Sequence, residues 1–324
     1  MRSVVSWMER QQVPLYIAAI LLGAAAGTVA PSLGPGLTAS INPVLGLLLF
    51  ATFLGVPLIQ VGRAFKDVRF LGAVVVVNFA IVPLVVWGLS RFVAGDRDLL
   101  VGVLLVLLAP CVDYVIVFTG IAGGAKDRLL AAAPLLMLLQ IVLLPVFLLL
   151  FAGSGATSLI KVGPFAEAFL FLIVIPLVAA AVVQAWAREH RAGVVIENVM
   201  QALMVPLMMA TLAVVIGSQI SAVGSRIGQL LLVVPLYVAF LIVMPIVGLI
   251  AGWIAKLDVP ARRALVFTGS TRNSLVVLPL ALSLPVSLSL APLAVVTQTL
   301  VELVGMIVFV RLIPRLIPHR RTKG

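Results

Sequence analysis

Three ionisable side chains lie inside long apolar stretches of this sequence, where a charge is hard to accommodate. They are Asp113, Arg272 and Glu302, and each lies within a segment that is otherwise mostly apolar. An ionisable group in the middle of a lipid-embedded segment costs about 2.5–3.5 kcal/mol or more unless it is paired or hydrated. We therefore take these three residues as the first candidates for a functional site.

Each candidate has a structural interpretation beside the functional one. Asp113 and Arg272 can form a buried ion pair that only locks two parts of the molecule together, or they can set the charge of a binding site. Glu302 lies one helical turn after Gln298. Its carboxyl can be protonated and hydrogen-bonded to that amide, or it can carry a coupling proton.

The chain has a single cysteine, Cys111, so an intrachain disulfide is excluded. A lone cysteine in an apolar segment is most often a small buried hydrophobe. Cys111 directly follows Pro110, however, in a place where a helix is expected to break. A thiolate is a soft ligand that suits soft metals and metalloids, which makes Cys111 a candidate for binding such a solute.

Two segments around these residues are poor helix formers. Proline at Pro110 removes a backbone donor and clashes with the preceding turn. The run from Gly269 through Arg272 to Ser274 is a polar interruption of an otherwise apolar stretch. Non-helical backbone at membrane depth is tolerated only against protein or a water-filled cavity. We expect two interrupted helices that cross near the middle of the membrane, with Pro110 and Gly269 at the breaks.

The composition requires a lipid environment for most of the surface. Of the 324 residues, 63% are hydrophobic and only 10% are charged, and the formal net charge is +11. Soluble domains carry about 25% charged residues. The basic residues fall in short clusters between apolar runs, which orients a membrane protein and does not indicate a nucleic-acid partner. We expect no cofactor and no permanent metal site.

An enzyme is not expected either. The sequence has no Ser/His pair and no cluster with metal-ligand spacing, and its two histidines, His190 and His319, lie in charged segments where a solvated role is sufficient. A channel-like or receptor protein is a further possibility. It would not account for the internal repeat described below, and we expect no sensor domain in the chain.

Apolar runs separated by charged or Gly/Pro-rich turns predict ten transmembrane helices. The expected spans are 13–30, 41–62, 70–90, 99–122, 129–152, 164–187, 198–219, 227–254, 262–284 and 290–313.

The basic residues predict how these spans are oriented. Only Arg91, Arg97, Lys161 and Arg226 fall in loops on one side, Arg272 lies within a span, and all other Lys and Arg residues fall on the opposite side. Positive charge collects in the cytoplasm. The sequence therefore predicts a multi-pass protein of a bacterial-type inner membrane, with both termini cytoplasmic.

The two halves of the chain resemble each other. Pro134 is followed by Gln140 at the same spacing as Pro292 by Gln298, and an offset of 158 residues carries Asp113 to Thr271. Five spans in each half make the halves opposite in orientation. Residues 1–155 and 156–324 are therefore predicted to be two inverted five-helix repeats, an architecture typical of transporters with a site at the repeat interface.

The stretch from Leu108 to Gly120, with its Ala-Pro-Cys element, resembles the fourth-helix signature of arsenite/antimonite permeases, which belong to the bile acid:sodium symporter superfamily. The interruption at 268–274 and the segment from Gln298 to Glu302 are similar to a branch of that superfamily. The resemblance covers nearly the full length.

The resemblance implies an all-α membrane protein of ten helices. It implies a panel domain, at about 13–62 and 164–219, beside a core domain, at about 70–152 and 227–313, in which discontinuous helices four and nine cross. It also implies a secondary active transporter that extrudes trivalent arsenic or antimony on the proton gradient. Cys111 takes the position of the metalloid-binding cysteine and Glu302 that of the proton-coupling acid.

The sequence also departs from that family. Arsenite permeases carry Asn-Asn and a nearby Glu in the ninth-helix break, whereas this chain has Thr271, Arg272, Asn273 and Ser274. A fixed positive charge there repels sodium, which favours protons as the coupling ion. The same arginine permits an alternative function, the symport of a small organic anion whose carboxylate or sulfonate pairs with Arg272.

The expected site has three groups of residues, besides the lipid bilayer and a small inorganic or organic solute as partners. Substrate binding is assigned to Cys111, Asp113, Ser270, Thr271, Arg272 and Asn273, ion or proton coupling to Asp113, Gln298 and Glu302, and the helix breaks to Pro110 and Gly269.

Overall fold

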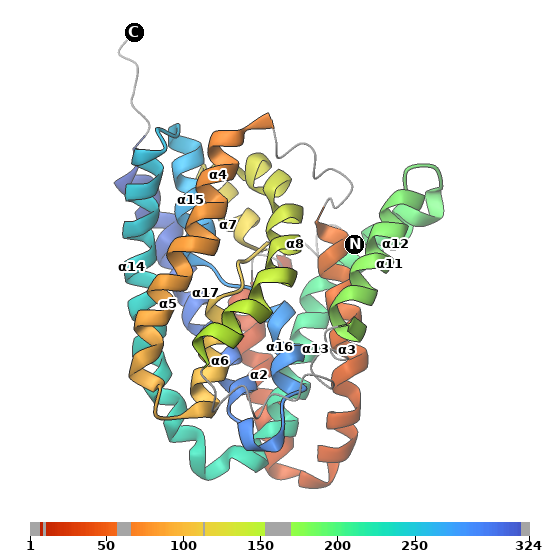
Figure 1. Cartoon of the computed structure of the whole chain (residues 1–324). Helices are drawn as coiled ribbons and strands as arrows, with labels where there is room; N and C mark the ends of the chain where they lie inside the picture. The colour runs from red at the N-terminus through yellow and green to blue at the C-terminus, as the bar shows by residue number, and fades with distance from the viewer. Residues whose placement is uncertain (1–6, 9–10, 57–65, 113, 153–169, 319–324) are drawn as a thin grey trace.

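The computed structural model describes residues 7–8, 11–56, 66–112, 114–152 and 170–318, and throughout these ranges the chain is helical with short connections (Figure 1). The longer helices, in chain order, are α2 (Gln12–Val29), α3 (Gly34–Gly55), α4 (Val68–Val76), α5 (Val82–Ser90), α6 (Arg97–Leu107), α7 (Tyr114–Ile121), α8 (Lys126–Phe151), α11 (Ile175–Trp186), α12 (Arg191–Ala202), α13 (Met204–Val223), α14 (Val233–Ile254), α15 (Val259–Ser270), α16 (Ser274–Leu282) and α17 (Ala291–Leu316). The predicted all-helical class is confirmed.

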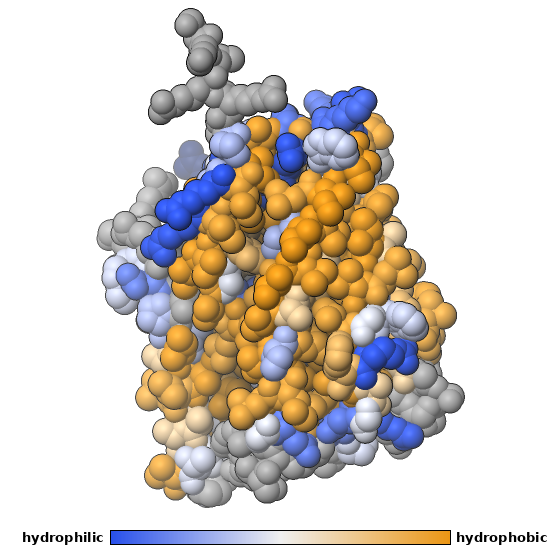
Figure 2. All heavy atoms as spheres, turned by 90° about the vertical axis from the view of Figure 1, so that its left-hand side faces the viewer, coloured by the Kyte–Doolittle hydropathy of each residue, from blue (hydrophilic) through white to orange (hydrophobic). Residues whose placement is uncertain are grey.

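The outer surface is that of a membrane protein. Figure 2 shows a band of hydrophobic residues across one face, with hydrophilic residues gathered toward its two ends. Large aliphatic and aromatic side chains project outward along this surface, among them Leu22 of α2, Leu149 of α8 and Trp253 of α14. Soluble proteins rarely expose so much apolar area, and these side chains therefore mark the lipid-facing side of the helices.

Five helical stretches in the described part of the chain are long and apolar enough to cross a bilayer, namely Gly34–Gly55, Val68–Val93, Lys126–Phe151, Gly228–Ile254 and Ala291–Leu316. The pair Arg191–Ala202 and Met204–Ser218, bent by 49°, is a sixth candidate. The predicted fourth and ninth spans are each divided into two short helices, so neither is among them. The count of ten spans stays a prediction.

Two predicted spans differ from the structure in their course. The seventh was expected as one helix from residue 198, but α12 begins already at Arg191 and the chain turns between α12 and α13. In the third, a π-helical turn at Val77–Ile81 joins α4 to α5. Pro83 follows this turn and has no N–H to donate, so the helix accommodates it by locally widening its hydrogen-bond spacing.

The helices pack in two sets. In one set, α13 packs against both α2 and α3, and α3 also contacts α11 and α12. In the other, α14 packs on α15, α17 and α5, while α6 packs on α17, α16 and α5. The sets correspond in sequence to the predicted panel and core. That these sets are separate domains, and that residues 1–155 and 156–324 are inverted repeats, remain predictions.

Glycine allows a close helix contact in the second set. A Cβ atom on Gly102 of α6 would lie 2.8 Å from the carbonyl oxygen of Ala291 and 2.8 Å from the Cβ of Ala294, both on α17. Small residues are the usual means of bringing membrane helices together, because apolar lipid supplies no hydrophobic force between them. The contact fixes α6, which leads into the first predicted break, against α17, which carries Glu302.

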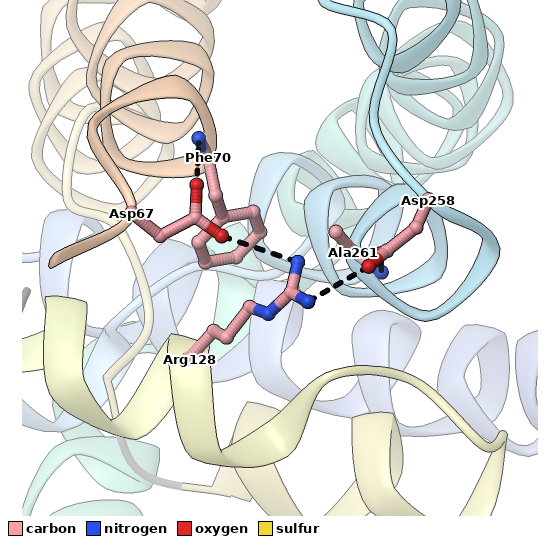
Figure 3. A network of polar contacts seen from close by, with 5 residues as sticks. All are labelled: Asp67, Phe70, Arg128, Asp258 and Ala261. Carbon is pink, nitrogen blue, oxygen red and sulfur yellow. Dashed lines mark hydrogen bonds and ion pairs between the residues drawn. The ribbon is translucent and has the colours of Figure 1, made fainter.

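At one end of the second set, a charged cluster ties three helices together (Figure 3). Asp67 caps α4 by accepting the N–H of Phe70 at 3.0 Å, and Asp258 caps α15 by accepting the N–H of Ala261 at 2.9 Å. The guanidinium of Arg128, on α8, contacts both carboxylates, at 3.1 Å and 2.7 Å. We call Asp67, Arg128 and Asp258 the end cluster.

Candidate functional site

The two predicted interruptions are both present, and they meet. Pro110 lies between α6 and α7, Arg272 lies between α15 and α16, and the two residues face each other in an isolated antiparallel bridge. The N–H of Asn273 donates to the carbonyl of Ala109 at 2.8 Å, and the N–H of Cys111 donates to the carbonyl of Thr271 at 3.3 Å. We call this pairing of the two extended segments the crossing.

Pro110 accounts for the first interruption. The last turn of α6 tightens, with the N–H of Ala109 reaching back three residues to Val106 at 3.4 Å, and Pro110 then has no N–H with which to continue. The next N–H, that of Cys111, bonds across the crossing and not to Leu107, which lies four residues earlier. The carbonyl of Leu107 is thereby released from the helical ladder.

Side-chain and cross-segment bonds account for the second interruption. The N–H of Arg272 donates to Glu302 Oε2 at 2.8 Å, where helical continuation would have it donate to Thr268. The N–H of Asn273 donates to Ala109, where continuation would have it donate to Gly269. The carbonyls of Thr268 and Gly269 are therefore also released at the C-terminal end of α15.

The guanidinium of Arg272 occupies the space that these released carbonyls surround. Its Nη2 lies 2.8 Å from the carbonyl oxygens of Thr268 and Gly269 and 2.8 Å from Asn78 Oδ1, and its Nη1 lies 3.4 Å from the carbonyl of Leu107. The ring of Phe240 lies 5.4 Å from the guanidinium carbon. Arg272 is fully buried. Dipoles that the breaks have freed thus stabilise its charge.

Asn78 is a site residue that the sequence analysis did not single out. It lies in the π-helical turn, and its Nδ2 donates to the carbonyl of Val74 at 3.0 Å and to Thr268 Oγ1 at 3.4 Å. These donors fix the amide so that its oxygen faces Arg272. An asparagine in an apolar run five residues before a proline was the available signal, because π-turns in helices often mark functional positions.

Glu302 and Gln298 lie together as the sequence predicted. Glu302 Oε2 accepts from Gln298 Nε2 as well as from the N–H of Arg272, and both side chains are buried. Gln298 Oε1 has no hydrogen-bond partner among the described residues. The carboxyl is thus held by neutral donors away from water, an arrangement in which gain or loss of one proton changes the local bonding.

Cys111 lies within the crossing itself. Its side chain is fully buried, and it stands three residues before the first residue of α7. Asp113, the predicted charge partner, lies outside the described residues.

The remaining predicted residues divide into two kinds. The hydroxyls of Ser270 and Thr271 bond back to the carbonyls of Val266 and Phe267, at 2.8 Å and 2.9 Å, and so complete their own helix. Asn273 caps α16 by accepting the N–H of Val276 at 3.2 Å. Asn273 Nδ2 and Ser274 Oγ are buried and have no hydrogen-bond partner in the described part of the chain.

The crossing therefore gathers a thiol, a carboxyl, a caged guanidinium and two polar groups with bonding capacity to spare. Within the described residues, His, Cys, Asp and Glu side chains form no group of three that could hold a metal ion.

Comparison with known proteins agrees with a transport protein. The family model described as the Sodium Bile acid symporter family matches residues 42–229, which is more than half of the chain and includes Pro110 and Cys111. No curated protein matches the chain. The second break and Glu302 lie beyond the matched residues.

Proposed function

We propose, since this chain belongs to the sodium bile acid symporter family and is therefore a multi-pass membrane transporter, that its task is the proton-coupled extrusion of trivalent arsenic or antimony. The proposal includes its place in a bacterial-type inner membrane with cytoplasmic termini. It also includes the panel and core domains inferred from the sequence. Cys111 binds the metalloid and Glu302 exchanges the proton.

One observation carries the proposal. Cys111 donates its N–H to Thr271, and the next residue, Arg272, donates its N–H to Glu302. The thiol and the carboxyl are therefore joined through two adjacent residues of one extended segment. A change at either group shifts the hydrogen bonding of that segment, which is what coupling between a solute and a proton requires.

The Cys111 thiol binds the metalloid by ligand exchange. At neutral pH the solute is an uncharged trihydroxide, and the thiol replaces one hydroxide: a sulfur–arsenic bond forms, an arsenic–oxygen bond breaks, and the thiol proton leaves with the hydroxide as water. Asn273 Nδ2 and Ser274 Oγ offer hydrogen bonds to the two remaining hydroxyls. A single thiol gives a bond that can be reversed, as transport demands.

Protonation of Glu302 supplies the coupling. As a carboxylate it accepts strongly from the N–H of Arg272 and from Gln298. A proton on the carboxyl weakens both bonds and loosens the second break from α17. Thr271, which precedes Arg272, accepts the N–H of Cys111. Weaker bonding of Arg272 to Glu302 therefore also changes the position of Cys111 and favours release of the solute.

The contacts of Arg272 favour a neutral solute over an organic anion. Its guanidinium is surrounded by Asn78 and by three backbone carbonyls. An anion would have to displace those acceptors to pair with it, at a cost typical of breaking buried hydrogen bonds to a charge. The symport of a small organic anion remains the alternative function, and it predicts anion uptake that is lost in Arg272→Gln and unaffected in Cys111→Ser.

The test is metalloid resistance in an arsenite-sensitive bacterial host, together with antimonite binding by the purified protein. Full-length protein should confer resistance, and Cys111→Ser, which changes one atom, should abolish both resistance and binding. Met137→Leu, a buried sulfur-containing side chain on α8, is the matched control and should retain both. Full resistance in Cys111→Ser would rule out the thiol mechanism.

A further inference from the structure

Three helix ends of the second set meet at one end of the molecule. The guanidinium of Arg263, on α15, donates through Nε and Nη2 to the carbonyl of Ile317, at the end of α17, at 3.1 Å and 2.8 Å. The neighbouring Arg262 packs on α14, because a Cβ atom on Gly252 would lie 3.0 Å from its Cγ atom. The C-terminal ends of α14 and α17 and the N-terminal end of α15 are therefore side by side, at the upper left of Figure 1.

Basic side chains are gathered where these helices end. Lys256 lies just after α14, Arg262 lies in the first turn of α15, and Arg311 and Arg315 lie toward the end of α17. We call these four residues the basic surface. Arg262 is half-buried and the other three are exposed. The ion pairs formed within the described residues belong to the end cluster, which includes Asp258, the acid nearest to Lys256 in the sequence. The basic surface thus has no carboxylate partner in the described part of the chain.

The backbone at Lys256 shows that a basic side chain is held here at a conformational cost. Lys256 has a φ of 51°, in the left-handed region. The N–H of Leu257 donates to the carbonyl of Gly252 at 3.1 Å, so α14 ends in a turn whose left-handed position is usually glycine. The Cβ atom of a lysine disfavours that conformation. Because glycine would relax the turn, the lysine indicates a use for its charge.

Two arginines on α17 also lack compensation from within the chain. Arg311 and Arg315 are four residues apart and both exposed, so they lie on the same side of the helix. Like charges at this spacing repel each other and destabilise a helix. Arg315 lies in the last turn, where the helix dipole favours a cation, but Arg311 lies one turn earlier. An anion from outside the chain that lies between them would remove the repulsion.

Trp253 indicates the depth of the basic surface relative to the membrane. Its side chain is 72% exposed and it precedes Lys256 by three residues. Tryptophan concentrates at the boundary between the hydrocarbon and the headgroups of a bilayer. On α17, Leu312 and Leu316 are exposed next to the two arginines. Cations at headgroup level beside exposed apolar side chains suit a ligand with a charged head and apolar chains.

We infer that the basic surface binds the phosphate headgroup of an anionic phospholipid, whose acyl chains lie along the exposed apolar side chains of α14 and α17. Basic sites between transmembrane helices bind such headgroups by charge. A zwitterionic lipid is a poorer ligand, because its own ammonium group offsets its phosphate. A headgroup with two phosphates is the best ligand, since it can contact cations from more than one helix. The bound lipid then joins the ends of α14, α15 and α17.

The test titrates the purified full chain, in a neutral detergent, with cardiolipin, phosphatidylglycerol or phosphatidylcholine and follows the melting temperature. Cardiolipin should raise the melting temperature by several degrees in a saturable manner, since a ligand stabilises the state that binds it. Phosphatidylglycerol should act only at higher concentration, and phosphatidylcholine should have no effect. Equal shifts with all three lipids would overturn the inference.

Lys256→Gly separates the charge from the backbone. The change relieves the left-handed conformation, so the protein without added lipid should melt at the same temperature or higher. The shift produced by cardiolipin should nevertheless become smaller, because one cation is lost. A purely structural role of Lys256 would not move the two measurements in opposite directions.

Arg311→Gln combined with Arg315→Gln should lose most of the cardiolipin shift. Arg188→Gln combined with Arg191→Gln, two exposed arginines where α11 turns into α12, is the matched control and should keep it. If the first double variant cannot be purified, Lys256→Gly still decides. A cardiolipin shift of wild-type size in Lys256→Gly would overturn the inference. No metalloid is used, so failure here is distinguishable from failure of the proposed function.

Discussion

Arg128 and Arg272 both hold helices together in this protein, and they do so by opposite means. Arg128, in the end cluster, contacts the carboxylates of Asp67 and Asp258, and its side chain is 42% exposed. Arg272, at the crossing, is fully buried, and the described acceptors around it are three backbone carbonyls and one amide. The described partners of Arg128 are carboxylates in contact with solvent, and those of Arg272 are buried dipoles.

The difference predicts which of the two can be released. Charges near water interact weakly and are screened by salt, so the end cluster can open and close at little cost. Dipoles in a closed interior cannot be replaced by water, so the crossing is rigid unless its hydrogen bonding is changed from within. A transporter needs a rigid binding site and also contacts at the membrane surface that can break and re-form. The predictions below test whether the crossing is the rigid part and the end cluster the part that can open.

Glu302→Gln is expected to have the largest effect. The amide keeps an oxygen that can accept the N–H of Arg272, so the fold should be retained, but it can no longer gain or lose a proton. Transport by inverted vesicles should fall to background, and the residual rate should not depend on a pH gradient. Transport that keeps its dependence on the pH gradient in this variant would show that the coupling proton is carried elsewhere.

Asn78→Leu should cause the largest loss of stability among single polar substitutions. It removes the side-chain acceptor of Arg272 and leaves that part of a buried charge without its partner, at about 1–3 kcal/mol or more. The melting temperature in detergent should fall, and by the same amount at low and high salt. Asn198→Leu, an exposed position on α12, is the matched control and should change little.

The sequence was sufficient to predict the two interruptions and that they lie together. Proline at Pro110 and the polar run around Arg272 can be recognised locally, because each disfavours helix where an apolar run otherwise demands it. The link between Glu302 and Gln298 follows from helical spacing. These features depend on neighbours in the chain, which is why they could be predicted.

The cage around Arg272 could not be predicted in this way. Its acceptors come from three parts of the chain, at Asn78, Leu107 and the end of α15, and three of the four are backbone carbonyls that carry no sequence signal. The sequence therefore predicted that the Arg272 guanidinium pairs with Asp113 or with an anionic substrate. The structure adds that the guanidinium donates hydrogen bonds to the backbone carbonyls that the two helix breaks leave without a helical partner.

Gly102→Ala tests whether the crossing is rigid because α6 and α17 are packed together. The added methyl group would lie 2.8 Å from Ala294 Cβ and from the carbonyl of Ala291, so the helices must separate, at about 1–3 kcal/mol. Gly72→Ala on α4, where a Cβ meets nothing within 4 Å, is the matched control and should leave stability unchanged or raise it. Equal melting temperatures for the two variants would mean that the α6–α17 contact adapts freely.

Arg128→Ala should have the smallest effect on stability. Each exposed ion pair contributes about 0–1 kcal/mol, and both aspartates keep their capping bonds to Phe70 and Ala261 after the change. The melting temperature should fall slightly at low salt and match the wild type at high salt, because the lost interactions are those that salt screens. A large fall in melting temperature that persists at high salt would show that the end cluster is as rigid as the crossing. The contrast between a rigid centre and ends that can open would then be wrong.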